Sequence, residues 1–116
     1  MKKDSKKMNR INSEVQRELS QIIRESKDPR IHPLTSVTHV EVTTDLKECK
    51  AYVSVLGTDE EREATEEGLK SASGHIRSEL AHRLNLRNTP EIKFIMDTSI
   101  EDAMEMMKKI DEVNGL

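Results

Sequence analysis

Apolar residues recur every three or four positions near the start of the chain, which predicts an amphipathic helix beginning at about residue 8. The segment "KDPRIHP" at 27–33 ends this helix, because proline disfavours helical backbone in the residue before it. The preceding "MKKDSKK" has no apolar stripe, so we expect residues 1–7 to form a flexible basic arm. The predicted stripe comprises Met8, Ile11, Val15, Leu19, Ile22 and Ile23.

Between residues 37 and 56 the apolar period changes to two, which predicts two strands with one buried face each. The segment "TDLKE" at 44–48 is short enough for a hairpin, so the strands should pair antiparallel. The inward positions are Val40, Val42 and Thr44 in the first strand and Ala51, Val53 and Val55 in the second.

Thr58 and Glu61 have the spacing of a capping box and predict the start of a second helical region. The apolar stripe of this region ends at "NLRNTP", residues 85–90, where Asn and Pro break the helix. After this segment, Ile92, Phe94 and Met96 alternate with outward positions and predict a third strand. A last helix should follow, with Ile100, Ala103, Met107, Ile110 and Val113 on one side. The stripe of the second region comprises Ala64, Leu69, Ala72, Ile76, Leu80 and Leu84.

This order of elements predicts an α+β fold in which helices cover one face of a three-stranded sheet. At 116 residues the chain has room for one domain, which we assign to residues 8–97, with residues 98–116 forming a C-terminal helix or tail. The pattern gives no basis for the order of the strands.

Charge is distributed unevenly along the chain. The net charge is −3, yet residues 1–30 hold nine Lys/Arg against five Asp/Glu, and residues 91–116 hold three against seven. A second basic cluster lies in the later part of the central helical region and comprises Lys70, Arg77, Arg83 and Arg87. Solvated faces explain most such residues, but two separate clusters favour a polyanionic partner.

No set of residues points to catalysis. Cys49 shares the register of Ala51 and Val53, which favours a small buried side chain over a reactive thiolate. The four histidines have no ligand spacing, and the glycines form no phosphate loop. We therefore predict a non-enzymatic protein without metal, cofactor or small-molecule substrate, keeping a carboxylate-based hydrolase as a remote alternative. Lacking a signal peptide or membrane-spanning run, it should be soluble and cytoplasmic.

The segment "LKSASGHIRSEL" at 69–80 interrupts the central helical region at Ala72-Ser73-Gly74. Glycine inside a helix costs about 1 kcal/mol relative to alanine, so the interruption needs an explanation. One is close packing, in which the missing side chain lets the bent helix lie on a neighbour. The other is a bend that aims backbone amides at a phosphate, and both can hold together.

Two helices joined by a glycine-containing turn, after a hairpin and before a strand, resemble a KH domain. With "VTHVEVTTDLKECKAYVSVLG" at 37–57, "LRNTPEIKF" at 86–94 and Asp97-Thr98-Ser99, the chain resembles the ribosome-binding factor A family of bacterial ribosome-maturation proteins. The resemblance implies a single-domain type II KH fold and a non-enzymatic factor that binds the small (30S) ribosomal subunit in late maturation. It also implies assistance with 16S rRNA 5′-end processing and a role in cold adaptation.

We expect RNA contacts through phosphate, since the strands offer only Tyr52 and Phe94 for stacking. Further expectations are a monomer, no membrane partner, and contacts with 16S rRNA and neighbouring ribosomal proteins. The alternative is a protein-binding adapter that uses the Met-rich terminal helix, although a core stripe explains Met104, Met106 and Met107 more simply. The predicted RNA-binding residues are Ser73, Gly74, His75 and Arg77 at the bend, Lys2, Lys3, Lys6, Lys7 and Arg10 in the arm, and Lys47 and Lys50 at the hairpin.

Overall fold

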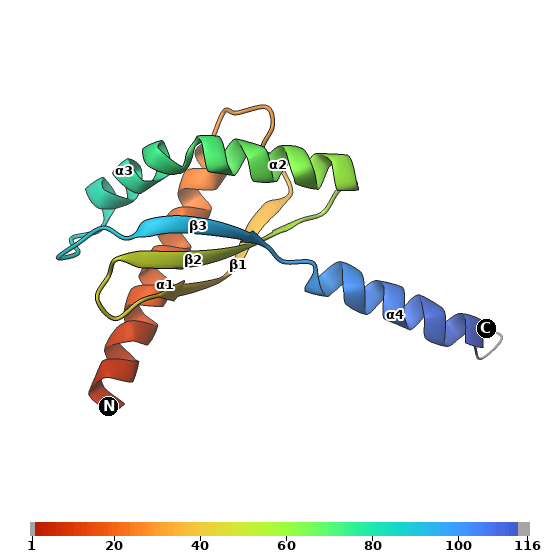
Figure 1. Ribbon diagram of the computed structural model, residues 1–116, viewed down its shortest axis with the longest axis horizontal. Helices are drawn as coiled ribbons and strands as arrows, with labels where there is room; N and C mark the ends of the chain where they lie inside the picture. Colours follow the sequence, from red (N-terminus) through yellow and green to blue (C-terminus); the bar gives the residue numbers. More distant parts are fainter. Residues whose placement is uncertain (1, 114–116) are drawn as a thin grey trace.

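The computed structural model describes the backbone of residues 2–113 and, within it, the side chains of residues 6–98, 102 and 104–110. Figure 1 shows the arrangement of the elements. In chain order they are α1 (Lys2–Glu25), β1 (Thr35–Val42), β2 (Glu48–Val55), α2 (Asp59–Ser71), α3 (Ser73–Arg83), β3 (Glu91–Met96) and α4 (Ser99–Val113).

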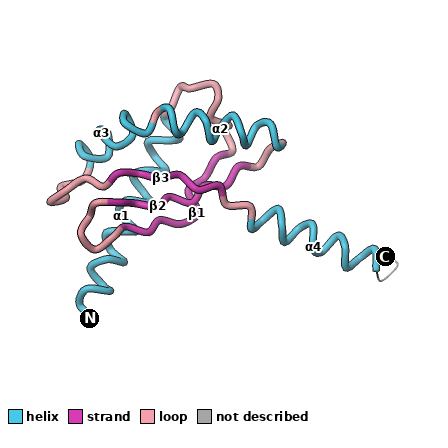
Figure 2. The backbone as a smooth tube through the Cα atoms, viewed as in Figure 1, coloured by secondary structure: helices cyan, strands magenta, loops and turns pink. Residues whose placement is uncertain are grey.

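The three strands form one mixed sheet in the order β1-β2-β3 (Figure 2). β1 and β2 pair antiparallel, with Val42 opposite Cys49, which confirms the predicted hairpin. β3 lies parallel to β2, with Cys49 opposite Ile92, so the chain must cross over through α2 and α3 before it returns to the sheet. The central strand is therefore β2.

One face of the sheet is covered by helices, as the alternating pattern predicts. α1 packs against β1 and α3, while α2 and α3 pack against β3. The opposite face remains exposed and carries Glu41, Lys50 and Lys93. The α+β prediction is confirmed. The hydrophobic core is aliphatic apart from Cys49 and Phe94, and its most deeply buried aliphatic members include Val15, Leu19, Val40, Ala51, Val53, Val55, Leu69 and Leu80.

α1 begins at Lys2, six residues before the position that the apolar stripe predicts. The segment 2–7 contains no glycine or proline, so nothing in it stops the helix from continuing towards the N-terminus. Lys6 and Lys7 consequently project from a helix instead of an extended segment. The mobility of residues 1–7 and the boundaries at 8 and 98 stay predictions.

The capping box at the start of α2 is present. Glu61 N–H donates to Thr58 Oγ1 over 3.1 Å, and Thr58 N–H donates to Glu61 Oε1 over 2.8 Å. The second bond is the main cause of a lowered pKa for the Glu61 carboxyl. Its stabilising effect is therefore present at neutral pH and is lost as the pH falls through that lowered pKa.

We expect Thr58→Ala to lower the free energy of unfolding by about 1 kcal/mol, because the substitution removes the side-chain acceptor of the first turn of α2. Urea denaturation at pH 7 measures the change. Thr58→Ser, which retains the hydroxyl, is the matched control and should remain within a few tenths of a kcal/mol of the wild type. Equal losses in both variants would contradict a capping role.

α4 projects away from the rest of the molecule (Figure 1), and its methionines are exposed: Met104 by 65%, Met106 by 65% and Met107 by 67%. The expectation that these residues form a core stripe is therefore wrong. α1, α2 and α3 already cover the buried face of the sheet. A new helix starts beyond β3, where Asp102 N–H donates to Thr98 O over 2.8 Å.

Candidate nucleic-acid interface

The interruption between α2 and α3 is a single residue, Ala72, with φ −89° and ψ 0°. Its N–H donates to Gly68 O over 3.0 Å and ends α2, while its carbonyl accepts from Ile76 N–H over 2.9 Å and begins α3. The helical backbone hydrogen bonds thus end at Ala72 and begin again from the same residue, with no loop between α2 and α3. The two helices remain close in sequence but form separate segments.

The first turn of α3 presents backbone donors at the surface. The N–H groups of Ser73, Gly74 and His75 occupy the positions that lack acceptors within a helix, and no side chain caps this turn. The Ser73 hydroxyl instead donates to Lys70 O over 2.9 Å. Gly74 and His75 are exposed, so an anion could approach these amides.

Close packing does not explain Gly74. Among the described residues, no heavy atom lies within 4 Å of a Cβ built on it. Gly68 has the packing role instead, since a Cβ there would lie 3.1 Å from both Arg30 Cβ and Ile31 Cγ1. The packing interpretation of Gly74 is therefore wrong. The close approach occurs six residues earlier, at Gly68, where α2 crosses the loop between α1 and β1.

Two of the four cations in the second basic cluster are engaged by other parts of the protein. Arg77 donates from Nε and Nη2 to Thr89 O, over 3.2 and 2.9 Å, and so holds the loop that leads into β3. Arg83 lies within 3.6 Å of carboxylate oxygens of Glu18 and Glu79 and 2.7 Å from Glu25. The cluster therefore offers less free positive charge than its residue count indicates; RNA contact by Arg77 stays a prediction.

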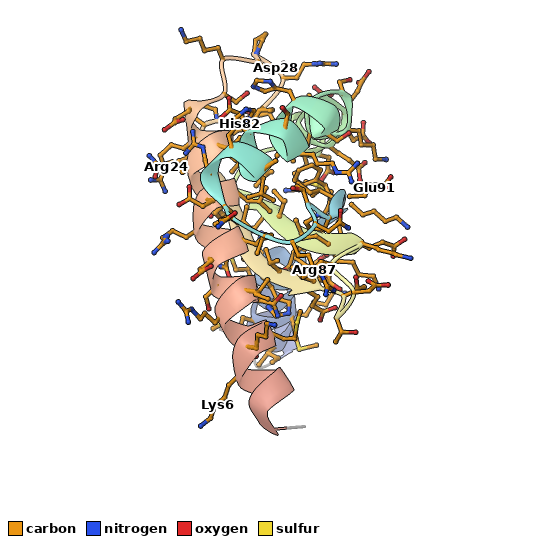
Figure 3. All side chains as sticks on the ribbon, turned by 90° about the vertical axis from the view of Figure 1, so that its left-hand side faces the viewer. Lys6, Arg24, Asp28, His82, Arg87 and Glu91 are labelled. Atoms are coloured by element: carbon orange, nitrogen blue, oxygen red, sulfur yellow. The ribbon has the colours of Figure 1, made fainter. Side chains whose placement is uncertain are left out.

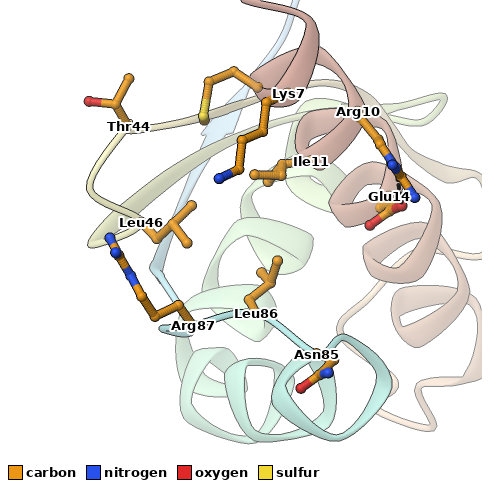
Figure 4. A pocket seen from close by; sticks show the side chains of 10 residues that line it. Lys7, Arg10, Ile11, Glu14, Thr44, Leu46, Asn85, Leu86 and Arg87 are labelled. Carbon is orange, nitrogen blue, oxygen red and sulfur yellow. Dashed lines mark hydrogen bonds and ion pairs between the residues drawn. The ribbon is translucent and has the colours of Figure 1, made fainter. Parts of the chain in front are cut away.

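A hollow of about 670 Å³ brings together cations that are far apart in the sequence (Figure 4). We call it the basic hollow. It lies between the N-terminal half of α1, the β1–β2 turn and the loop between α3 and β3. Lys7 and Arg10, both predicted from the sequence, line it together with Arg87. The full lining is Lys7, Met8, Arg10, Ile11, Glu14, Thr44, Leu46, Asn85, Leu86 and Arg87.

Arg87 is the residue that the sequence-based hypothesis missed. It belongs to the second basic cluster, but it lies in "NLRNTP", after the predicted end of the helix. Loop residues follow no regular spacing, so the sequence does not predict the direction of the Arg87 side chain. In Figure 4 its side chain stands beside Leu46, across the hollow from α1.

The remaining predicted lysines lie elsewhere. Lys50 is on the exposed face of the sheet, opposite Glu41 in register and beside Glu48 around a shallow depression. Lys47 lies in the β1–β2 turn, where its N–H donates to Asp45 Oδ1 over 3.1 Å. Lys6 projects from the start of α1 (Figure 3), and the side chains of Lys2 and Lys3 fall outside the described residues.

The groups that could react are either buried or isolated. Cys49 is fully buried, as its register predicts, and burial raises its thiol pKa to about 12. Within the described side chains, no three His, Cys, Asp or Glu residues come together as metal ligands. None of the described helices is both long and apolar enough to span a bilayer.

Comparison with known proteins relates this chain to one protein family. The family profile of ribosome-binding factor A matches residues 7–110. The chain belongs to the ribosome-binding factor A family. The family member of Lachnospira eligens is 61% identical over 114 residues, covering 97% of this chain and 88% of its own length. That of Agathobacter rectalis is 62% identical over 114 residues, covering 97% of this chain and 94% of its own.

Solved structures of ribosome-binding factor A share the fold, which is of the type II KH-like class. The solution structure of a Thermotoga maritima member superposes with a TM-score of 0.67 at 36% identity, over 75% of this chain and 83% of that one. The crystal structure of the Thermus thermophilus factor gives 0.69 at 24% identity, over 77% and 93%. A model of the Thermus thermophilus factor fitted into a map of its 30S complex gives 0.64 at 24% identity, over 75% and 91%.

Proposed function

We propose that the protein binds the small (30S) ribosomal subunit in the cytoplasm during late maturation, without catalysing a reaction. In this role it assists rearrangement of 16S rRNA and processing of its 5′ end. Mispaired RNA helices persist longer in the cold, so such assistance matters most at low temperature. Membership of the ribosome-binding factor A family supports the proposal, as does the 30S complex of the Thermus thermophilus factor.

The observation that carries the proposal is the convergence of Lys7, Arg10 and Arg87 on one hollow. These cations come from two segments about 77 residues apart in the sequence, so the fold is needed to assemble them. A cationic surface attracts RNA phosphates and releases their counterions, which supplies affinity without base specificity. The amides at the start of α3 add a second, separate phosphate-binding position, flanked by His75.

We expect the protein to co-sediment with small subunits in a strongly salt-dependent manner, and more with immature than with mature particles. If about three cations contact phosphate, the logarithm of the affinity should fall with the logarithm of salt concentration with a slope of roughly −2 to −3. Deletion of residues 1–7 should reduce that slope by about 1 or more without unfolding the protein. A slope near zero would contradict binding through phosphate.

A protein-binding adapter is the second candidate, because α4 exposes Met104, Met106, Met107 and Ile110 on a projecting helix. Methionines form adaptable binding surfaces, and an adapter would bind a ribosomal protein without RNA. Ribonuclease treatment of the co-sedimenting particle separates the two candidates. Release of the protein supports RNA binding, whereas retention on the remaining protein supports the adapter.

A further inference from the structure

The floor of the basic hollow is aliphatic. Ile11 and Leu46 are buried, and Met8 and Leu86 are partly buried and pack against the core. These residues come from three separate segments and all line the hollow. Figure 4 shows Ile11, Leu46 and Leu86 around the same space. A phosphate ion alone gains nothing from such a floor, since apolar atoms offer an anion no hydrogen bond. The hollow is suited to an occupant with a flat apolar part as well as a charge.

The rim of the hollow is cationic. Lys7 and Arg87 make no hydrogen bond or ion pair within the part of the chain that the structure describes. Arg10 Nε lies 3.3 Å from Glu14 Oε1, in an exposed pair that contributes little to stability and is readily exchanged. Three cations and one carboxylate leave the rim with a charge of about +2. The rim therefore favours a negatively charged ligand over a neutral or basic peptide.

One wall of the hollow is held in place before any ligand binds. Leu46 has a φ of 59°, a left-handed conformation that is rare for a bulky residue and costs on the order of 1–3 kcal/mol. Its N–H donates to Thr43 O over 2.9 Å, and its carbonyl accepts from Asn88 Nδ2 over 3.0 Å. The β1–β2 turn is thereby fixed to the loop that carries Leu86 and Arg87. The Leu46 side chain of this fixed turn is buried and forms part of the floor.

We propose that the basic hollow binds one unpaired nucleotide of RNA, with its base on the aliphatic floor and its phosphates on Lys7, Arg10 and Arg87. This inference rests on the proposed function and specifies how the RNA is bound. The volume lies within the range of sites that hold a small ligand. A base within a helix cannot reach the floor, so the site selects single-stranded or displaced nucleotides.

The site is separate from the first turn of α3. None of the residues from Ala72 to Arg77 lines the basic hollow, which lies beyond the opposite end of α3. The four floor side chains offer a base apolar contact, and the uncharged polar side chains of the hollow that could contact a base edge are those of Thr44 and Asn85. What the hollow recognises is the presence of an exposed base next to phosphate.

The test compares a single-stranded RNA of about six nucleotides with the same RNA carrying abasic sugars, by fluorescence anisotropy with the full-length protein. The wild type should bind the intact RNA at least about 5-fold more tightly than the abasic RNA, because a base on the floor removes apolar surface from water. Leu86→Ser should remove this preference and leave the salt dependence unchanged. Arg87→Gln should weaken both RNAs equally and lower the salt slope by about 1.

Matched controls separate the hollow from general effects. Leu34→Ser removes an exposed leucine outside the hollow, and Arg24→Gln removes a cation outside it; both should retain the preference for intact RNA. If Leu86→Ser lowers the melting temperature, Met8→Gln provides a second change to the floor. Equal wild-type affinity for intact and abasic RNA overturns the inference. So does an identical effect of Leu34→Ser and Leu86→Ser.

Failure of the inference is distinguishable from failure of the proposed function. Subunit co-sedimentation without a preference for intact RNA overturns the nucleotide site and leaves ribosome binding in place. A preference for intact RNA without subunit co-sedimentation overturns ribosome binding. If a peptide occupies the hollow instead, Leu86→Ser should reduce retention on ribonuclease-treated particles while RNA affinity stays unchanged, which also overturns the inference.

Discussion

Gly68→Ala should lower the free energy of unfolding by about 1–3 kcal/mol, because the new Cβ would lie 3.1 Å from Arg30 Cβ and Ile31 Cγ1. The loop that carries these neighbours cannot yield easily. Arg30 donates to both carboxylate oxygens of Asp28, over 2.8 and 3.1 Å, and His32 N–H donates to the buried Thr65 hydroxyl over 3.1 Å. Overpacking should therefore exceed the roughly 1 kcal/mol that alanine gains over glycine in a helix.

Gly74→Ala is the matched control, since it adds the same methyl group to the next helix with no described atom within 4 Å. We expect its stability to remain unchanged or to rise by up to about 1 kcal/mol. Urea denaturation of the two variants measures the contrast. Equal losses would contradict the assignment of close packing to Gly68. Should Gly74→Ala lose subunit binding while remaining stable, Gly74 would be placed at the RNA contact.

Replacing Lys7, Arg10 and Arg87 together by glutamine should weaken binding to immature small subunits by about 10- to 100-fold at moderate salt. The reason is the loss of up to three phosphate contacts, which should also reduce the salt slope by roughly 2–3. None of the three side chains is buried, so the melting temperature should change little. Co-sedimentation across a salt series measures both quantities.

A variant with glutamine in place of Arg24, Lys108 and Lys109 is the control for net charge. These cations lie outside the basic hollow, on α1 and α4, and their removal changes the charge of the protein equally. Binding should fall much less than in the other triple variant. Equal losses would indicate nonspecific attraction between the whole protein and the particle, with no special contribution from the hollow.

Periodicity was enough to predict the order of the elements and most inward positions of α1, α3 and the strands, because burial on one side of a helix or strand follows from spacing. Thr44, which it placed on the inward face, is exposed and lies beyond the end of β1. The spacing of Thr58 and Glu61 located the capping box, and the strand register located the buried position of Cys49. Partners at long sequence separation were not predictable. The engagement of Arg83 by Glu18 and Glu25 depends on how α1 crosses α3, which no local pattern records.

Two errors share a physical origin. The interruption at Gly74 and the stripe of methionines in α4 were both interpreted from one segment, whereas packing depends on what lies opposite. Gly68 meets the loop after α1, and α4 meets nothing that the structure describes as covering its methionines. The basic hollow likewise combines three segments, so Arg87 became a candidate only when the fold placed it across from Lys7 and Arg10.

The burial of Cys49 has a practical consequence for the labelling of this protein. It is the one cysteine in the chain, and a thiol with a pKa of about 12 inside the core is almost entirely protonated at neutral pH and inaccessible to maleimides. A cysteine introduced at Met104 or Leu34 would therefore be the sole reactive sulfur of a folded molecule. Fluorophores and crosslinkers can be attached at one chosen point without first removing the native cysteine.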